Sequence, residues 1–210
     1  MSAPGARGRN VTWHAGGVSR EARAATTGTG ATVWMTGLPA SGKSTIAVAA
    51  EAALIAAGRA AYLLDGDNLR HGLNADLGFS DSDRSENMRR VAEVARLLAD
   101  AGLVVLVSLV SPFVVDRERA RALHAADDLP FLEVFVDTPV EECQRRDPKG
   151  LYARARAGEI EGMTGLDAPY ERPASPTVVV RPAEQSVDEA VTTVLSHLGT
   201  GSTAVETQPG

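Results

Sequence analysis

The sequence predicts an α/β fold in which a parallel β-sheet is sandwiched by helices. Short β-branched runs alternate with amphipathic stretches along most of the 210 residues, a pattern that favours parallel strands joined by right-handed crossovers. The β-branched runs are almost continuously apolar, which is typical of strands covered on both faces. A glycine-rich loop at residues 37–44 separates the first such run from the first amphipathic stretch.

The predicted elements follow one another in a simple order. Strands are expected at residues 32–36, 60–64, 103–110, 131–136 and 177–180, and helices at 43–57, 84–101, 116–125, 139–145 and 187–198. Gly58 and Gly102 stand where the residue after a helix C-cap belongs. Residues 66–83 and 147–175 are polar and expected to be irregular. Loops at the carboxyl ends of parallel strands bind ligands in α/β proteins, so functional residues are expected there.

Composition narrows the class of protein. The length suits one domain, predicted at residues 11–199 between flexible ends at 1–10 and 200–210. A formal net charge of −6 argues against a nonspecific nucleic-acid binder, because such proteins need a basic face. The sequence contains no apolar run long enough to cross a bilayer, and the single cysteine, Cys143, fits a reducing compartment. We therefore expect a cytoplasmic protein that binds neither nucleic acid nor membranes.

The loop between the first strand and the first helix matches the phosphate-binding pattern G-x-x-x-x-G-K-[ST]. Its glycines permit backbone N–H groups to point inward at an anion, and the following helix adds its positive dipole end. Lys43 is expected to reach the β- and γ-phosphates of ATP, and Ser44 to ligate Mg²⁺. A chance glycine-rich turn is the alternative, but the flanking strand and helix argue against it. The predicted ATP-binding residues are Gly37, Leu38, Pro39, Ala40, Ser41, Gly42, Lys43, Ser44 and Thr45.

This loop alone does not separate kinases from GTPases and motor ATPases. The sequence contains no N-K-x-D stretch for guanine, and the chain is too short for the extra subdomains of most motor ATPases. The favoured class is therefore a P-loop kinase that phosphorylates a small molecule or a nucleotide.

Two acids flank a glycine where the second predicted strand ends, within LLDGDNLRHGLN. A turn would explain Asp65 and Asp67, but adjacent carboxylates repel each other and Arg70 follows closely. That strand is expected next to the strand of the phosphate loop, which would turn both acids toward the γ-phosphate. A carboxylate there can hold a Mg²⁺-bound water or accept the proton of the attacking hydroxyl. We therefore expect Asp65 and Asp67 to be catalytic and Arg70 to bind an anionic group of the acceptor.

Two further segments carry candidate acceptor groups. Ser82 or Asp83 is expected to cap a helix whose first turn presents Arg84 and Asn87 to an oxyanion. Phe79 could stack on a flat group or plug the core, and both alternatives are open. Residues 145–165 contain too few apolar side chains for independent packing, so they are expected to form a mobile lid that closes over polyphosphate. Within it, Lys149 and Arg156 are expected to neutralise charge in the transition state or to hold the anion of the acceptor.

Several long stretches together resemble adenylylsulfate kinase. The most specific are DGDNLRHGLN and DPKGLYARARAGEI, and the resemblance extends from about residue 10 to residue 198. It implies phosphoryl transfer from Mg-ATP to the 3′-hydroxyl of adenosine 5′-phosphosulfate in sulfate assimilation. It also implies a homodimer and an association with ATP sulfurylase. The alternatives are a kinase for another small metabolite, or a nucleotide-binding domain that docks on a sulfurylase without turnover.

The resemblance also implies a set of site residues. Ser111, in VSPF, matches a serine described as a phosphoserine intermediate in bacterial members, although a loose transition state needs positioning more than a protein nucleophile. Lys43, Asp65, Asp67 and Ser111 form the expected catalytic set. The implied acceptor site comprises Asp67, Asn68, Arg70, Phe79, Arg84, Asn87, Val110, Ser111, Lys149, Gly162 and Met163.

The chain departs from the family pattern at three places. Pro39-Ala40 replaces the usual Ser-Gly in the phosphate loop, and phosphate binding is expected to survive because neither position needs a side chain. Met163 stands where the family commonly has Phe, which replaces a flat ring by a flexible thioether. Val114 stands where bacterial members often have Arg, so one basic contact is expected to be absent.

Overall fold

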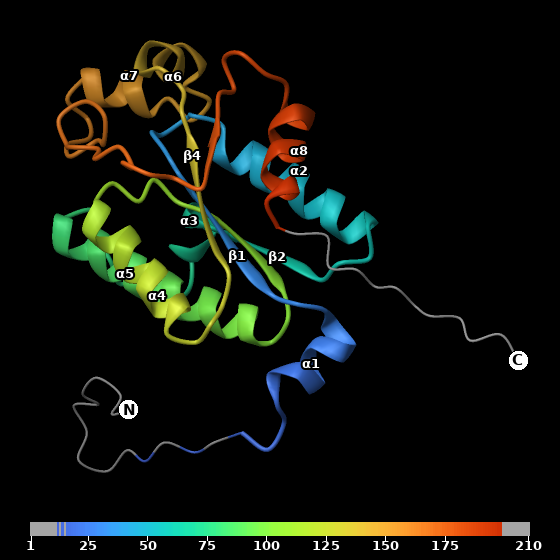
Figure 1. Cartoon of the computed structure of the whole chain (residues 1–210). Helices are drawn as coiled ribbons and strands as arrows, with labels where there is room; N and C mark the ends of the chain where they lie inside the picture. The colour runs from blue at the N-terminus through green and yellow to red at the C-terminus, as the bar shows by residue number, and fades with distance from the viewer. Residues whose placement is uncertain (1–11, 13, 15, 199–210) are drawn as a thin grey trace, which may run out of the picture.

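A five-stranded parallel β-sheet forms the centre of the structure, a computed structural model that describes residues 12, 14 and 16–198 (Figure 1). The strand order is β2-β3-β1-β4-β5, and each of the four strand pairs is parallel. The predicted α/β class is confirmed. The strands are β1 (Ala31–Thr36), β2 (Ala61–Asp65), β3 (Val104–Ser108), β4 (Phe131–Val136) and β5 (Val178–Val180).

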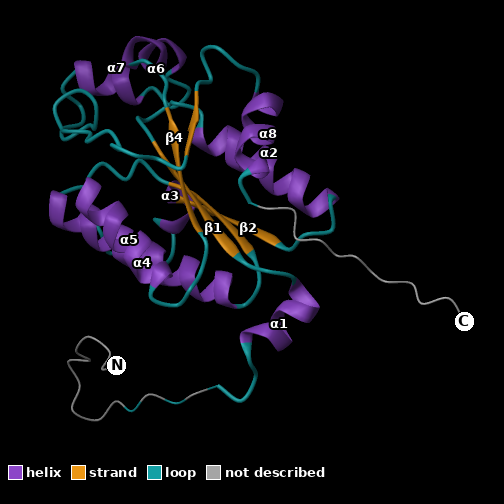
Figure 2. Ribbon diagram, viewed as in Figure 1, coloured by secondary structure: helices purple, strands orange, loops and turns teal. Residues whose placement is uncertain are grey.

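Helices cover both faces of this sheet (Figure 2). One face is covered by α2 (Lys43–Ala56) and α8 (Val187–Ser196), the other by α4 (Asp81–Asp100) and α5 (Val114–Ala125). The short helix α3 (Gly66–Leu69) follows β2, while α6 (Val140–Arg146) and α7 (Leu151–Arg156) lie beyond the carboxyl end of β4. The first helix, α1 (Arg20–Thr27), lies at the opposite end of the sheet.

Apolar side chains fill the space between each helical layer and the sheet. Val33, Met35 and Leu106 point toward α2 and α8, and all three are fully buried. Trp34, Val105 and Val107 point the other way, toward α4 and α5, and are fully buried too. Successive residues of one strand thus face opposite cores, which explains why the strands read as continuous apolar runs.

The expected position of β2 is wrong. β3, and not β2, is the neighbour of β1 on this side, so β2 forms the edge of the sheet. Burial explains the difference: all five β3 residues are buried, whereas Tyr62 of β2 is 54% exposed. The fully buried β3 therefore occupies the interior on this side. The acids at the end of β2 approach the phosphate loop across the end of β3.

Three helices lie outside the predicted set. In α1, Ser19 caps the first turn, and Arg20 and Arg23 both form ion pairs with Asp100 at the end of α4. The other two, α3 and α7, lie within the segments expected to be irregular. Both are only one or two turns long, too short for a helical hydrophobic period to appear in the sequence.

Several predicted boundaries also shift. Ser80, not Ser82 or Asp83, caps α4 by accepting a hydrogen bond from the backbone N–H of Asp83, so the helix begins at Asp81. β3 ends at Ser108, two residues before its predicted end. Gly58 and Gly102 do follow the C-caps of α2 and α4, with φ of +74° and +99°, as predicted.

No helix of the described residues has the length and apolar character needed to span a membrane. The predicted flexible ends, residues 1–10 and 200–210, lie outside the described residues.

Candidate active site

The phosphate loop connects β1 to α2 through glycines that no other residue could easily replace. Gly37 has a φ of +149°, and a Cβ atom there would lie 2.7 Å from the carbonyl oxygen of Val136. Gly42 has a φ of +108° and serves as the N-cap of α2. The loop therefore has the left-handed turns and exposed helix N-terminus that an anion-binding nest requires.

Lys43 lies folded over its own loop. Its Nζ donates hydrogen bonds to the carbonyl oxygens of Gly37 (2.9 Å) and Leu38 (2.7 Å) and to Ser41 Oγ (3.3 Å). The side chain is buried, and burial lowers the pKa of its ammonium group to about 8. Lys43 can therefore gain strongly from an anion that compensates its desolvated charge.

The hydroxyl of Ser44 links the phosphate loop to the acids after β2. Ser44 Oγ donates a 2.7 Å hydrogen bond to Asp65 Oδ2 and lies 3.1 Å from Ser108 Oγ at the end of β3. Asp65 also accepts the backbone N–H of Asp67 through its other oxygen, at 3.0 Å, and so caps α3. Asp65 thus reaches the loop across the end of β3, although its strand is not adjacent to β1.

Of the two unusual residues of the loop, Ala40 has a strained backbone and Pro39 is held by a hydrogen bond from α7. Ala40 has a φ of +59°, in the left-handed region that favours glycine. The carbonyl oxygen of Pro39 accepts a 3.1 Å hydrogen bond from the hydroxyl of Tyr152 in α7. The following segment therefore braces the loop at the position where glycine is usual.

Lys149 forms an ion pair with Asp67. Both side chains are more than half exposed, Lys149 at 59% and Asp67 at 63%. Asn68, on the next position of α3, is also exposed. The structure thus brings together the predicted lid lysine and the second acid. Arg156, by contrast, bonds Gln144 of α6.

Phe79 lies beside two guanidinium groups and is 64% exposed, so it does not plug the core. The guanidinium carbon of Arg70 is 4.2 Å from the ring centroid and that of Arg84 is 5.9 Å away. Arg70 is held by the carbonyl oxygens of Leu77 (3.1 Å) and Gly78 (2.9 Å). An exposed ring with two cations beside it provides a surface for an aromatic ligand that carries negative charge.

Arg84 also joins α4 to the segment that follows α7. Its guanidinium donates to Thr164 Oγ1 at 2.8 Å and to the carbonyl oxygen of Gly162. Asp167 accepts the backbone N–H groups of Gly162 and Met163, and these bonds, led by that of Gly162, lower the pKa of its carboxyl. Partial burial lowers the pKa of Arg84. The backbone at Gly162 is therefore fixed beside a partly desolvated cation.

Met163 does not face Phe79 as an exposed stacking partner. It is only 6% exposed and packs in a small apolar cluster with Cys143 and Tyr152. Leu38 of the phosphate loop packs against the same cluster. In this chain, Met163 thus ties the predicted lid to the loop.

Asn87 is buried on α4 and oriented by a residue that the sequence did not single out. Its Oδ1 accepts a 2.9 Å hydrogen bond from Nδ2 of Asn74, which is fully buried. The Oδ1 of Asn74 has no hydrogen-bond partner among the described residues. Because Asn87 uses its oxygen in this bond, its NH₂ group remains as a donor. A buried Asn in a polar turn could have been noticed, but its partner is 13 positions away.

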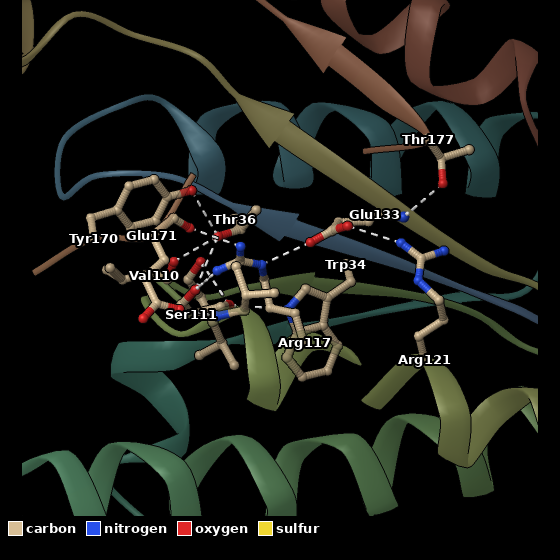
Figure 3. A network of polar contacts seen from close by, with 12 residues as sticks. Trp34, Thr36, Val110, Ser111, Arg117, Arg121, Glu133, Tyr170, Glu171 and Thr177 are labelled. Carbon is tan, nitrogen blue, oxygen red and sulfur yellow. Dashed lines mark hydrogen bonds and ion pairs between the residues drawn. The ribbon is translucent and has the colours of Figure 1, made fainter. Parts of the chain in front are cut away.

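Val110 and Ser111 form a sharp turn after β3, at the centre of a polar network (Figure 3). Ser111 is buried with a φ of +48°, and its Oγ accepts a 3.0 Å hydrogen bond from the indole of Trp34. The carbonyl oxygen of Val110 accepts the hydroxyl of Thr36 at 2.8 Å. The sequence did not predict Arg117 and Glu133, which complete this network, because their contacts depend on distant segments.

Comparison with known proteins identifies the family. The sequence profile described as Adenylylsulphate kinase matches residues 29–181. The chain belongs to the adenylylsulphate kinase family. Adenylyl-sulfate kinase of Saccharomyces cerevisiae is 49% identical over 189 residues, which cover 90% of this chain and 94% of the yeast protein. The family resemblance seen in the sequence is thereby confirmed.

Two other members place the chain within the family. The bifunctional enzyme NodQ of a Rhizobium species is 56% identical over 88% of this chain, but the match spans only 28% of that longer protein. The Mycobacterium tuberculosis APS kinase CysC, solved in complex with AMPPNP and APS, superposes with a TM-score of 0.80 at 55% identity. That match covers 82% of this chain and 99% of the solved one. The P-loop kinase fold predicted from the sequence is confirmed.

Proposed function

We propose that this chain transfers the γ-phosphate of ATP to the 3′-hydroxyl of adenosine 5′-phosphosulfate, which gives 3′-phosphoadenosine 5′-phosphosulfate and ADP. One observation carries the proposal. In a member of this kinase family, a complete phosphate loop is linked to Asp65 at the carboxyl end of β2, next to Asp67. The segment that follows these acids carries the exposed Phe79 ring with Arg70 and Arg84 beside it. The solved relative that holds both AMPPNP and APS supports the same pair of substrates.

The donor side uses the phosphate loop. Lys43 exchanges its carbonyl partners in the loop for phosphate oxygens, and the N–H groups of the loop and of the start of α2 bind the remaining oxygens. Residues 37–45 hold ATP through these backbone groups.

The paired oxygens of Ser44 and Asp65 fit Mg²⁺. They lie 2.7 Å apart, and Mg²⁺ in kinases takes one or two protein oxygens together with phosphates and water. The described residues contain no cluster of three or more His, Cys, Asp or Glu side chains suited to a metal. When bound, Mg²⁺ neutralises phosphate charge.

The acceptor side provides an aromatic surface, cations and one amide donor. Phe79 stacks on the adenine, while Arg70 and Arg84 bind the phosphosulfate with geometry that lysine cannot reproduce. The free NH₂ of Asn87 donates to an acceptor oxygen or ring nitrogen. Asn68, Val110, Ser111, Gly162 and Met163 complete the walls of this site.

Asp67 serves as the base of the reaction. The 3′-oxygen forms a bond to the γ-phosphorus while the bond from that phosphorus to the β–γ bridging oxygen breaks, and the hydroxyl proton passes to Asp67. Lys149 leaves Asp67 and neutralises charge on the transferring group. Because the Ser111 hydroxyl is buried against Trp34, we assign it to the scaffold of the acceptor loop and propose direct transfer without a phosphoserine.

Membership of the family also suggests a cellular location and protein partners for the chain. The expected cytoplasmic location, homodimer and association with ATP sulfurylase belong to this proposal. NodQ, a bifunctional relative much longer than the match, shows that this kind of domain occurs within larger enzymes. Light scattering of the purified chain, alone and with a sulfurylase, would measure both associations.

An acceptor panel tests the proposed reaction. ADP release would be followed with Mg-ATP and either adenosine 5′-phosphosulfate, AMP, or a neutral sugar. We expect efficient release only with adenosine 5′-phosphosulfate, because AMP lacks the sulfate and so leaves part of the basic cluster without its partner. Equal efficiency with AMP would make the chain a general nucleotide kinase and refute the proposed acceptor.

A further inference from the structure

Arg117 joins three segments that are distant in the sequence (Figure 3). This residue of α5 donates from Nε to Glu133 Oε1 of β4 at 2.8 Å, and from its two terminal nitrogens to the carbonyl oxygens of Ser111 (2.6 Å) and Glu171 (2.8 Å). Its side chain is 1% exposed and that of Glu133 is 9% exposed. The guanidinium thus connects the acceptor loop, the central sheet and the segment that returns from the predicted lid.

A buried ion pair of this kind is a poor source of stability. Desolvation of both charges offsets most of their attraction, and replacement by apolar residues of similar size is often neutral or stabilising. The role of the Arg117–Glu133 ion pair is therefore to be found in the segments that it positions, and not in stability. Arg121, one turn later on α5, bonds the other oxygen of Glu133 at 2.8 Å but is 40% exposed. Arg121 shares the partner without contacting either loop.

On the acceptor side, Arg117 supports a conformation that the backbone would not adopt alone. Ser111 has a φ of +48°, which is uncommon and costly for a residue other than glycine. Three contacts fix it: Arg117 and the Thr36 hydroxyl (3.3 Å) both donate to its carbonyl oxygen, and Trp34 donates to its Oγ. Since Thr36 directly precedes the phosphate loop, the acceptor loop is tied to the end of β1.

On the lid side, Arg117 holds the segment where the chain returns to the sheet. Glu171 also donates its N–H to the carbonyl oxygen of Pro112 (2.9 Å) and accepts the N–H of Val114 (2.6 Å). The hydroxyl of the neighbouring Tyr170 lies 3.0 Å from Thr36 Oγ1. The segment that returns from the predicted lid and the turn at Ser111 are therefore fixed to the same guanidinium.

We propose that Arg117 is a positioning residue for the acceptor: it sets the turn at Ser111 and anchors the returning lid segment, so that both meet the acceptor in one geometry. This inference rests on the proposed acceptor site at Val110 and Ser111. Lysine cannot replace Arg117, because a single ammonium lacks the planar fork that serves three segments at once.

The kinetic test compares Arg117→Lys with Arg121→Lys, which changes the same residue type on the same helix beside the same glutamate. We expect Arg117→Lys to raise the KM for adenosine 5′-phosphosulfate by about tenfold or more, with the KM for ATP within about twofold of the wild type. Arg121→Lys should change neither. A parallel rise in both KM values, or the same result for both variants, would overturn the proposal.

Fluorescence provides a readout apart from activity. The chain has two tryptophans, so a Trp13→Phe background leaves only Trp34, whose indole bonds Ser111. We expect Arg117→Lys in this background to shift the Trp34 emission, and Arg121→Lys to leave it unchanged. An unshifted emission together with a normal KM would show that Arg117 only stabilises the fold.

Two further variants keep the outcomes distinct. If Arg117→Lys does not fold, the double variant Arg117→Met with Glu133→Leu removes both buried charges at once. It should fold and show the same rise in the acceptor KM; a normal KM there would contradict the inference. Arg84→Ala tests the acceptor site itself. A rise with Arg84→Ala but not with the Arg117 variants would overturn only the positioning role, whereas no rise in either would overturn the site.

Discussion

Lys149 forms an ion pair with Asp67, which joins the predicted lid to the second acid after β2 across 82 positions of sequence. Both side chains are more than half exposed, at 59% and 63%. Exposed pairs of this kind contribute only about 0–1 kcal/mol, so this one can open at little cost. The ion pair therefore holds Lys149 close to the proposed base, Asp67, without fixing it there.

Replacing the acid should separate binding from turnover. Asp67→Asn keeps the shape of the side chain but can neither accept a proton nor attract Lys149. We expect kcat to fall by about 100-fold or more, while the KM for ATP changes little. Steady-state kinetics with Mg-ATP and adenosine 5′-phosphosulfate would measure both. A change in ATP affinity alone would make Asp67 a nucleotide-binding group and leave Asp65 as the catalytic acid.

Asp76 provides the matched control for this variant. It lies in the same polar segment between β2 and α4, is 62% exposed, and pairs with Arg90 through two short bonds. Asp76→Asn should leave kcat close to that of the wild type. A loss of turnover equal to that of Asp67→Asn would show that the effect comes from the loop and not from the base.

The buried ammonium of Lys43 predicts a pH dependence of ATP binding. Burial lowers its pKa to about 8 in the free protein, and bound phosphate favours the charged form and so raises that pKa. ATP affinity should be full below pH 8 and weaken as the pH rises above 8, by up to about tenfold per pH unit until the pKa of the complex is reached. Calorimetry without acceptor would measure this.

Lys43→Met supplies the control. It should bind ATP weakly and lose the decline above pH 8, and it should have almost no turnover because the charge on the transferring phosphoryl group is no longer neutralised. Burial raises the pKa of the nearby Cys143 thiol above its usual value. Burial also raises the pKa of Tyr170, to about 12. Neither group therefore loses its proton before Lys43. A decline that persists in Lys43→Met would assign the pH dependence to another group.

Much of the fold could be predicted because strong local patterns carry it. Continuous apolar runs identified all five strands, and glycines at positive φ marked the ends of α2 and α4. The strand order could not be derived in this way, since the alternation of strands and helices is the same for several orders. The helix α1 was missed for a related reason: its ion pairs connect Arg20 and Arg23 to Asp100, a residue far along the chain.

The candidate site likewise contains residues that local sequence patterns predict and residues that only the fold brings together. The phosphate loop and the Asp65–Asp67 pair are contiguous motifs, so their residue types reveal their chemistry. Asn74 and Arg117 gain their importance only from Asn87, Ser111 and Glu171, which the fold brings to them. Most asparagines and arginines lie on the surface, so the sequence alone does not indicate that these two are buried and hold other residues in place.

The left-handed backbone of Ala40 predicts that the same substitution, alanine to glycine, changes the free energy of unfolding in opposite directions at two positions. Ala40 has a φ of +59°, where the Cβ atom costs roughly 1–2 kcal/mol. Ala40→Gly should therefore stabilise the protein by up to about 1 kcal/mol after the entropy of the unfolded chain is included, with unchanged ATP affinity. Ala52→Gly, on the exposed face of α2, should destabilise it by about 1 kcal/mol. Urea unfolding would compare them, and equal signs would contradict the argument.

Arg84 predicts a selective loss of acceptor binding. Its guanidinium lies beside the Phe79 ring and also bonds Thr164 and Gly162, so Arg84→Ala removes a proposed anion ligand and also releases this end of the predicted lid. The KM for adenosine 5′-phosphosulfate should rise by about 10- to 100-fold, because one charged hydrogen-bonded contact contributes about 1.5–3 kcal/mol. The KM for ATP should stay within about twofold. Arg89→Ala is the control, since Arg89 lies on the same helix, is 62% exposed, and among the described residues hydrogen-bonds only Glu86. If the two variants raise the acceptor KM equally, general loss of positive charge explains the effect, and Arg84 has no specific role in acceptor binding.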